Sequence, residues 1–212
     1  MATTTYLTGT FFTNSNQDKC TFSVWLKRSL IGAQNNIFGV GSGAHQGSLN
    51  FNSSDQLDFY VYASSSFVGR LITNRKFRDT SAWYHIVMVY DSLNVTAGNR
   101  MRLYVNGVEE TSFATDTQPS SGQDTEFNSG STHNIGATGA ADAGVMFNGC
   151  MSHIHFCDGQ AYSASDFGET DATTGEWKIK TSPSVTYGTN GFFILKDGNG
   201  ITDQSGEGNN FT

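Results

Sequence analysis

The sequence is poor in charge, proline and cysteine, and each shortage excludes a class of protein. Charged residues make up 15% of the 212 residues, well below the usual quarter. Two prolines exclude a proline-rich stalk, and three widely spaced cysteines give no disulfide framework. The first residues lack the basic start and apolar run of a signal peptide, and no 18 apolar residues follow one another. These absences predict synthesis in a reducing cytoplasm and no membrane insertion.

Clusters of Lys or Arg are also lacking. The formal net charge is -7, and the densest basic stretch, RKFR at 75–78, is too short to follow a phosphate backbone. We therefore expect no nucleic-acid partner. The polarity comes from Ser, Thr, Asn, Gln and 24 glycines, which favour turns over helices. With 37% hydrophobic residues the chain can still bury a core.

Short strand-like runs recur along the chain. Residues 21–27 place Phe22, Val24 and Leu26 on one face, the alternation of a half-buried strand. Residues 83–91 are apolar on both faces, which predicts a central strand covered on both sides. Further strands are predicted at 49–51, 56–62, 100–113, 133–137, 147–157 and 190–197.

Turn-forming residues separate these runs. Asn106-Gly107 tolerates positive φ at both positions, as a type I′ hairpin requires, and NSSD at 52–55 predicts a second hairpin turn. Residues 163–169 could form one helical turn, and no longer helical period is present. Short antiparallel strands with turns about every 8–12 residues predict an all-β sandwich.

We expect one domain over residues 1–212. The core strands are predicted within about 6–157 and 190–197. The polar segment 158–189 is predicted to lie at the rim of the sandwich. Residues 203–212, rich in Gly and Asn, are predicted to form a flexible C-terminal end.

Five motifs follow one another along the chain: FSVWLKRS, WYHIVMVYD, NRMRLYVNGV, NIGA and FNGCMSHIHFCDGQAYSASDF. Their order resembles that of a known family, the laminin-G-like branch of the concanavalin A-like lectin/glucanase superfamily. The most specific part is the WYHIV strand followed by LYVNG. The resemblance covers nearly the whole chain and implies a jelly roll of two antiparallel sheets.

A narrower resemblance rests on three later motifs, DGQAYSASDFGETDATTGEWK, YGTNGFFI and DQSGEGNNFT. In these motifs the chain looks like virion proteins of tailed phages, especially marine ones. This resemblance implies a non-enzymatic structural protein on the virion exterior, synthesised in the host cytoplasm. Its expected partners are other virion proteins, first the major capsid protein, and further copies of itself as a homo-oligomer.

Two locations of the protein on the phage particle are compatible with this resemblance. A capsid decoration or head-projection protein is favoured because the sequence shows no internal repeat, heptads or anchoring segment of a tail-fibre shaft. The alternative is a tail-fibre or spike module that recognises host surface glycans, since the same sandwich serves both roles. A polysaccharide-degrading enzyme is the third interpretation.

A candidate glycan site lies on the predicted strand at 56–62. Tyr60 and Tyr62 share a strand face with Asp58. Two phenol rings and a carboxylate can stack on a sugar and hydrogen-bond to it. Aromatic residues are also common cross-strand partners where no ligand binds. Both interpretations stay open at this point.

The candidate metal ligands are His153 and His155. Strict alternation over 152–157 places them on one face with Cys157, about 7 Å apart. A closed zinc site needs four ligands, and the other histidines supply no second pair. Residues 197–208 resemble a calcium-binding EF-hand loop, but Ile201 and Thr202 occupy positions that need an oxygen ligand and a glycine. We predict no metal and no cofactor, although the family resemblance allows calcium at the rim.

No catalytic pattern is evident. The resemblance implies that a glucanase would have acidic residues two or three apart on one strand, because hydrolysis needs paired carboxylates. Glu109 and Glu110 are adjacent on a hairpin arm and so point to opposite faces. Nucleophile elbows and phosphate-binding loops are absent. We expect no enzymatic activity. The three tryptophans, Trp25, Trp83 and Trp177, are weaker candidates for sugar binding than the tyrosines, and Trp83 is predicted to pack at the start of the central strand.

Overall fold

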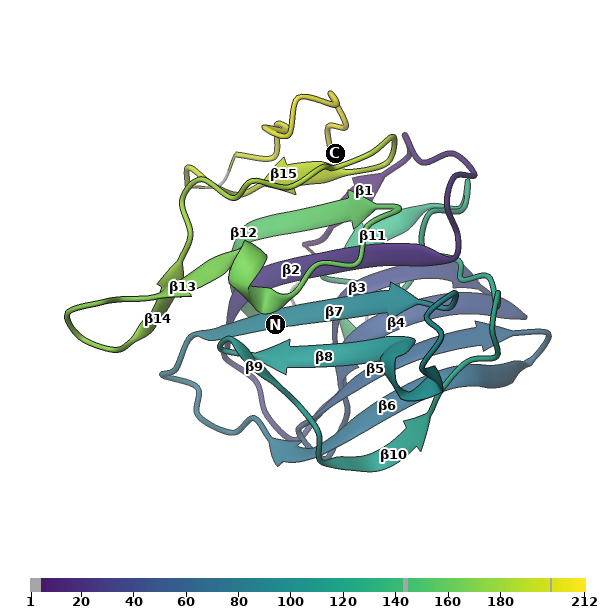
Figure 1. Cartoon of the computed structure of the whole chain (residues 1–212), viewed down its shortest axis with the longest axis horizontal. Helices are drawn as coiled ribbons and strands as arrows, with labels where there is room; N and C mark the ends of the chain where they lie inside the picture. Colours follow the sequence, from purple (N-terminus) through teal and green to yellow (C-terminus); the bar gives the residue numbers. More distant parts are fainter. Residues whose placement is uncertain (1–4, 143–144, 199) are drawn as a thin grey trace.

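The chain folds into two antiparallel β-sheets packed face to face (Figure 1), in a computed structural model that describes residues 5–142, 145–198 and 200–212. One sheet has seven strands in the order β1 (Leu7–Gly9), β11 (His133–Ile135), β3 (Asn35–Ser42), β4 (His45–Phe51), β5 (Gln56–Ala63), β6 (Ser66–Lys76) and β10 (Phe113–Thr117). The other has six, in the order β15 (Phe192–Ile194), β12 (Gly149–Asp158), β2 (Lys19–Arg28), β7 (Tyr84–Asp91), β8 (Met101–Val105) and β9 (Val108–Glu109).

Two smaller kinds of element complete the fold. Strands β13 (Gly168–Thr170) and β14 (Trp177–Ile179) form a separate hairpin, and single 3₁₀ turns occur at η1 (Ala97–Asn99) and η3 (Ala164–Asp166). The turn η3 confirms the one helical turn predicted at 163–169. Among the described residues, no helix has the length and hydrophobicity needed to cross a bilayer. The predicted all-β antiparallel sandwich is confirmed.

The main core fills the space between the two sheets. Phe22, Val24 and Leu26 point into it from β2, as the alternation predicted, and all three are fully buried. Aromatic rings join the sheets: Phe22 stacks on Phe38 of β3 with ring centroids 4.5 Å apart. Such rings bury large apolar areas, which is the main stabilising contribution here.

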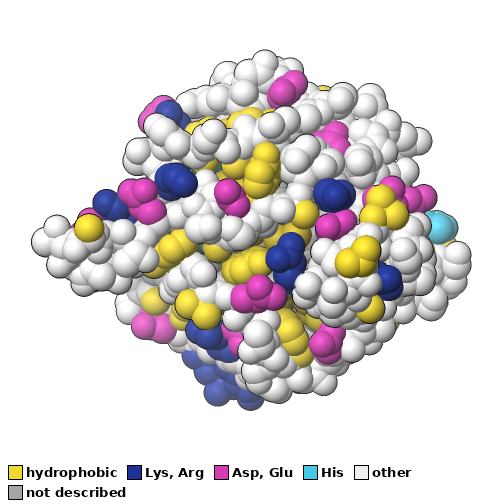
Figure 2. Space-filling model, viewed as in Figure 1, with side chains coloured by type: hydrophobic (Ala, Val, Ile, Leu, Met, Phe, Trp, Pro, Cys, Tyr) yellow, Lys and Arg dark blue, Asp and Glu magenta, His cyan; other side chains and the backbone are white. Residues whose placement is uncertain are grey.

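A third layer covers the outer face of the six-stranded sheet. It is built by residues 158–189, so their predicted position at the rim is wrong. Ala164 and Phe167 pack there on Val87 and Val89, the outward residues of β7. Figure 1 shows the green coil of η3 in front of the sheet, and Figure 2 shows hydrophobic side chains between polar ones on this face. The cause is the second apolar face of β7, which must be removed from water. The prediction that this strand is covered on both sides is confirmed.

The two predicted hairpin turns are present. Asn106 and Gly107 have φ of 48° and 84°, which confirms the type I′ turn between β8 and β9. Between β4 and β5, Asn52 Oδ1 accepts hydrogen bonds from the backbone N–H of Ser54 and Gln56, at 2.9 and 3.1 Å. This side chain holds the turn closed.

The C-terminal segment is attached to the sandwich, in contrast to the predicted flexible end at 203–212. Phe211 is buried and packs edge-on against Phe192, with centroids 4.7 Å apart. Thr212 exchanges backbone hydrogen bonds with Thr8 of β1, of 2.8 and 3.1 Å. The Asp203 carboxylate accepts three backbone N–H groups, which orders the loop between β15 and Phe211. The aromatic ring of Phe211 thus anchors an otherwise polar C-terminal segment in the core.

Candidate functional site

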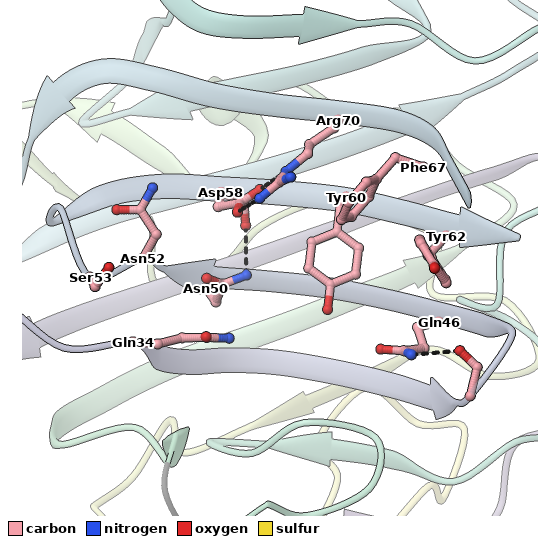
Figure 3. A pocket seen from close by; sticks show the side chains of 11 residues that line it. Gln34, Gln46, Asn50, Asn52, Ser53, Asp58, Tyr60, Tyr62, Phe67 and Arg70 are labelled. Atoms are coloured by element: carbon pink, nitrogen blue, oxygen red, sulfur yellow. Dashed lines mark hydrogen bonds and ion pairs between the residues drawn. The ribbon is translucent and has the colours of Figure 1, made fainter. Parts of the chain in front are cut away.

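A polar hollow of about 440 Å³ opens on the outer face of the seven-stranded sheet. Its floor is formed by β4, β5 and β6, and its margins by the turns at both ends of these strands (Figure 3). The side chains that line it are amides, aromatic rings and one ion pair: Gln34, Gln46, Asn50, Asn52, Ser53, Asp58, Tyr60, Tyr62, Phe67 and Arg70. We call this feature the polar hollow.

Strand alternation on β5 points the predicted residues into the polar hollow. Leu57 and Phe59 face the core and are fully buried, so Asp58, Tyr60 and Tyr62 face outward. The structure therefore brings together the three side chains that the sequence singled out.

An ion pair lies at the centre of the polar hollow. Arg70 of β6 lies opposite Tyr60 in the strand register. Its Nε and Nη2 donate to the two carboxylate oxygens of Asp58, at 3.0 and 2.7 Å. This two-pronged hydrogen bonding raises the pKa of the Arg70 guanidinium. The two hydrogen bonds to Asp58 therefore fix the direction of the arginine.

Three aromatic rings form one side of the polar hollow. Phe67 stands edge-on to both tyrosines, with centroids 5.3 Å from Tyr60 and 5.0 Å from Tyr62. The Arg70 guanidinium carbon lies 4.3 Å from the centre of the Phe67 ring, a cation–π contact. Burial raises the pKa of the Tyr60 hydroxyl, so Tyr60 stays a neutral donor and acceptor.

Buried polar side chains on the same sheet face form a network at the floor of the polar hollow. Asn50 donates to the Asp58 carbonyl and to Ser48 Oγ, both at 3.2 Å, and Ser48 donates to Asn36 Oδ1 at 3.0 Å. These three residues are almost fully buried. Such a network fixes side-chain positions because an unpaired buried polar group is costly.

The geometry suits a small polar ligand with an apolar face. Exposed ring faces can stack on the C–H surface of a sugar, while amides and hydroxyls satisfy its hydroxyl groups. Among the described residues that line the polar hollow, Asp58 is the one carboxylate, and both its oxygens accept from Arg70.

The histidine pair has a different setting from the one that alternation predicted. Ser152 pairs with Trp25 and His155 with Ser23, and a bulge between them gives His153 a φ of 47°. Ser152 therefore shares the outer face with His155. Strict alternation over 152–157 would place these two residues on opposite faces, so that part of the predicted pattern is wrong. The extra residue of the bulge shifts the alternation by one position.

Each histidine of the pair has protein partners of its own. His153 Nδ1 lies 2.7 Å from Ser152 Oγ. His155 is buried under the third layer, 2.9 Å from the Tyr187 hydroxyl, and its ring stacks on Phe193 at 3.9 Å. Burial lowers the pKa of the His155 imidazole. The described residues contain no group of three or more His, Cys, Asp or Glu that could hold a metal ion.

A second buried histidine, His85 on β7, contacts a serine. Its Nε2 lies 2.9 Å from Ser23 Oγ, and its Nδ1 accepts a hydrogen bond of 2.9 Å from Trp177 Nε1. Because Nδ1 accepts, the ring proton is on Nε2 and is donated to Ser23. Burial lowers the pKa of His85 to about 3, which keeps the ring neutral. A serine that accepts from histidine is not activated as a nucleophile, so this contact is structural.

The tryptophans behave differently from the sequence prediction. Trp83 is 44% exposed, so its predicted packing against the central strand is wrong. Trp177 does the packing instead: it covers the β8–β9 turn from the third layer and reaches His85. Its place depends on the path of residues 158–189, which no local pattern predicts.

Two residues of the polar hollow, Phe67 and Arg70, were also missed. Both lie on β6, and their contacts with β5 depend on a register that shifts between Val61 and Tyr62. The signal available in the sequence was the short aromatic and basic pattern of SFVGR at 66–70, directly after a strand with two tyrosines.

Comparison with known proteins agrees with the fold. A family model described as the concanavalin A-like lectin/glucanases superfamily matches residues 2–166. The chain belongs to this superfamily, and within it the model is a laminin G type. No curated protein sequence matches the chain.

The solved structures that are similar to it include the following two. One is the native heptameric SAP-like pentraxin from Limulus polyphemus, with 17% identity and a TM-score of 0.53 over 74% of this chain and 71% of that one. The other is the LG4-5 part of the mouse laminin alpha1 chain, with 10% identity and a TM-score of 0.50 over 90% of this chain and 44% of that one. At such identities the similarity concerns the fold alone.

Proposed function

We propose that this chain is a non-enzymatic carbohydrate-binding protein and that the polar hollow is its binding site. The observation that supports the proposal is the cluster of Tyr60, Tyr62 and Phe67 around the Asp58–Arg70 pair, on an open sheet face of a lectin-like sandwich. Rigid aromatic rings next to fixed polar groups are what a sugar needs for stacking and hydrogen bonding.

The same site is poorly suited to hydrolysis. Glycosidases use two carboxyl groups about 5–9.5 Å apart, one to protonate the leaving oxygen and one to attack or activate water. Asp58 is the one carboxylate among the described residues around the polar hollow, and Arg70 occupies both its oxygens. We therefore favour binding over catalysis.

Glycan-array screening followed by calorimetry tests the proposal. We expect Tyr62→Ala to weaken binding of the best glycan by about tenfold or more, because a stacking ring is lost. Tyr60→Phe keeps its ring and should also weaken binding, because a hydroxyl that can hydrogen-bond to the sugar is lost. The matched control is Trp83→Ala, which removes an exposed aromatic ring outside the polar hollow. Absence of binding to any glycan, or equal affinity of the Tyr62 variant, would contradict the proposal.

We also propose that the chain lies on a virion exterior, as a capsid decoration or head-projection protein that contacts the major capsid protein and further copies of itself. Its support is the likeness of residues 158–178, 187–194 and 203–212 to phage virion proteins. The alternative, a receptor-binding module of a tail fibre or spike, is favoured by the polar hollow. Immunogold labelling of intact particles separates the two: label spread over the head supports decoration, and label at the tail tip overturns it.

A further inference from the structure

The two side chains of the ion pair in the polar hollow differ in their exposure to solvent. The Asp58 side chain is 5% exposed, whereas the Arg70 side chain is 28% exposed. Both carboxylate oxygens face the guanidinium, 3.0 Å from Nε and 2.7 Å from Nη2. A ligand that enters the polar hollow therefore meets the positive member of the pair.

The exposed edge of Arg70 is held in a fixed orientation. Asp58 occupies the Nε and Nη2 edge, and Phe67 lies under the guanidinium plane at 4.3 Å. Nη1 makes no hydrogen bond to any residue that the structure describes, and it is not among the buried atoms that lack a partner. Its N–H groups are therefore available to an acceptor. A guanidinium held this way loses little freedom on binding and matches a planar carboxylate.

Among the described residues that line the polar hollow, Arg70 is the one positive charge. The other polar residues of the polar hollow are amides and hydroxyls, and the formal net charge of the chain is -7. Asp142, a neighbouring acidic residue, acts on Tyr60 electrostatically and adds negative charge. A general attraction for anions is thus absent, and any preference for an acidic ligand has to come from Arg70.

We propose that the polar hollow selects sugars that bear a carboxylate, such as uronic or sialic acids, and that Arg70 is the residue that determines this specificity. The inference rests on the carbohydrate-binding function proposed above and specifies the class of sugar. The tyrosine rings stack on the sugar, and the outer edge of the guanidinium binds its carboxylate.

The test uses sugars that differ only in charge. Calorimetry compares 3′-sialyllactose with its methyl ester, and a galacturonic acid oligomer with its methyl ester. In at least one pair the acidic sugar should bind about tenfold or more tightly, and added NaCl should weaken its binding, because an exposed ion pair is screened. A sulfated galactose oligomer that bound as tightly would overturn the assignment to a carboxylate.

Removing Arg70 alone would leave Asp58 buried and unpaired, which threatens the fold. The informative variant is therefore Asp58→Asn with Arg70→Gln, which removes both charges and keeps groups that can hydrogen-bond. We expect it to bind the acidic and the neutral sugar of a pair equally. Its matched control is Arg75→Gln with Glu110→Gln, a second Arg–carboxylate pair, whose arginine also lies on β6; the pair is 2.8 Å apart and away from the polar hollow.

The outcomes separate the two proposals. A preference for the neutral sugars, or an acidic preference that survives in the Asp58/Arg70 variant, would overturn this inference and leave the carbohydrate-binding proposal standing. Failure of every sugar to bind the unmodified chain would overturn both.

Discussion

Trp177 determines the tautomer of the buried His85. Its indole N–H donates to His85 Nδ1, so the ring proton is fixed on Nε2, where it is donated to Ser23. One hydrogen-bond donor from the third layer therefore joins that layer to β7 and, through the histidine, to β2. Burial lowers the pKa of His85 to about 3 and so keeps the ring neutral.

We predict that Trp177→Phe destabilises the fold by about 1–3 kcal/mol, because the buried Nδ1 of His85 loses its donor while the ring that covers the β8–β9 turn is largely kept. Urea unfolding followed by circular dichroism measures the change. Trp83→Phe is the control and should be neutral, since Trp83 is 44% exposed. Equal stability of the two variants would show that the hydrogen bond contributes nothing.

At the candidate site, the sequence revealed the residues of one strand and missed those of its neighbour. Tyr60, Tyr62 and Asp58 follow from alternation within β5, which is a local property. Phe67 and Arg70 reach them across a hairpin whose register is shifted by a bulge. A single residue of slip exchanges the two faces of a strand, so their contacts need the folded structure.

Among the elements, strands with a regular apolar alternation were predictable and irregular ones were not. The strand predicted at 21–27 is part of β2, and the one at 83–91 is β7. Strand β3 was missed because glycines interrupt its pattern. A Cβ atom on Gly39 would lie 2.6 Å from the Ala137 carbonyl oxygen. Position 39 requires glycine because a loop distant in sequence packs against it. The residues next to Gly39 in the sequence do not indicate this requirement.

The β8–β9 hairpin makes a prediction at the same scale. Gly107 has a φ of 84°, and a Cβ atom there would lie 2.6 Å from the Trp177 ring. Gly107→Val should therefore cost both backbone strain and displacement of Trp177. Gly32 has a φ of 72° and no atom within 4 Å of such a Cβ, so Gly32→Val isolates the strain, about 1–2 kcal/mol.

We expect Gly107→Val to lose more stability than Gly32→Val in thermal and urea unfolding. Its tryptophan fluorescence should also shift, because Trp177 must move. If the two variants lose the same amount and the fluorescence is unchanged, Trp177 does not pack on this turn.

For the whole molecule, the two outer faces have different roles. The six-stranded sheet is covered by residues 158–189, whereas the seven-stranded sheet leaves its outer face open and forms the polar hollow there. The apolar residues 87 and 89 on the second face of β7 predicted a cover but not which segment supplies it. That segment is polar on average, and its few apolar side chains have no regular spacing.

The attachment of the C-terminal segment is testable at this scale. Phe211 is 3% exposed and contacts Phe11 and Phe192. We predict that Phe211→Ala lowers the free energy of unfolding by about 3 kcal/mol or more, as for other buried phenylalanines. Val95→Ala is the control, because Val95 is 97% exposed. A neutral result for both would mean that residues 203–212 do not contribute to the core.

The hydrogen bonds between Thr8 and Thr212 place the two ends of the described chain side by side. Because the ends are neighbours, the strands could follow one another in a different order along the chain and still occupy the same positions in the sheets. A short linker could join the ends, and the chain could be reopened in the exposed β13–β14 turn without disturbing any strand pair of the two large sheets. Such a circular permutant would keep the sandwich while its termini moved to the opposite face from the polar hollow.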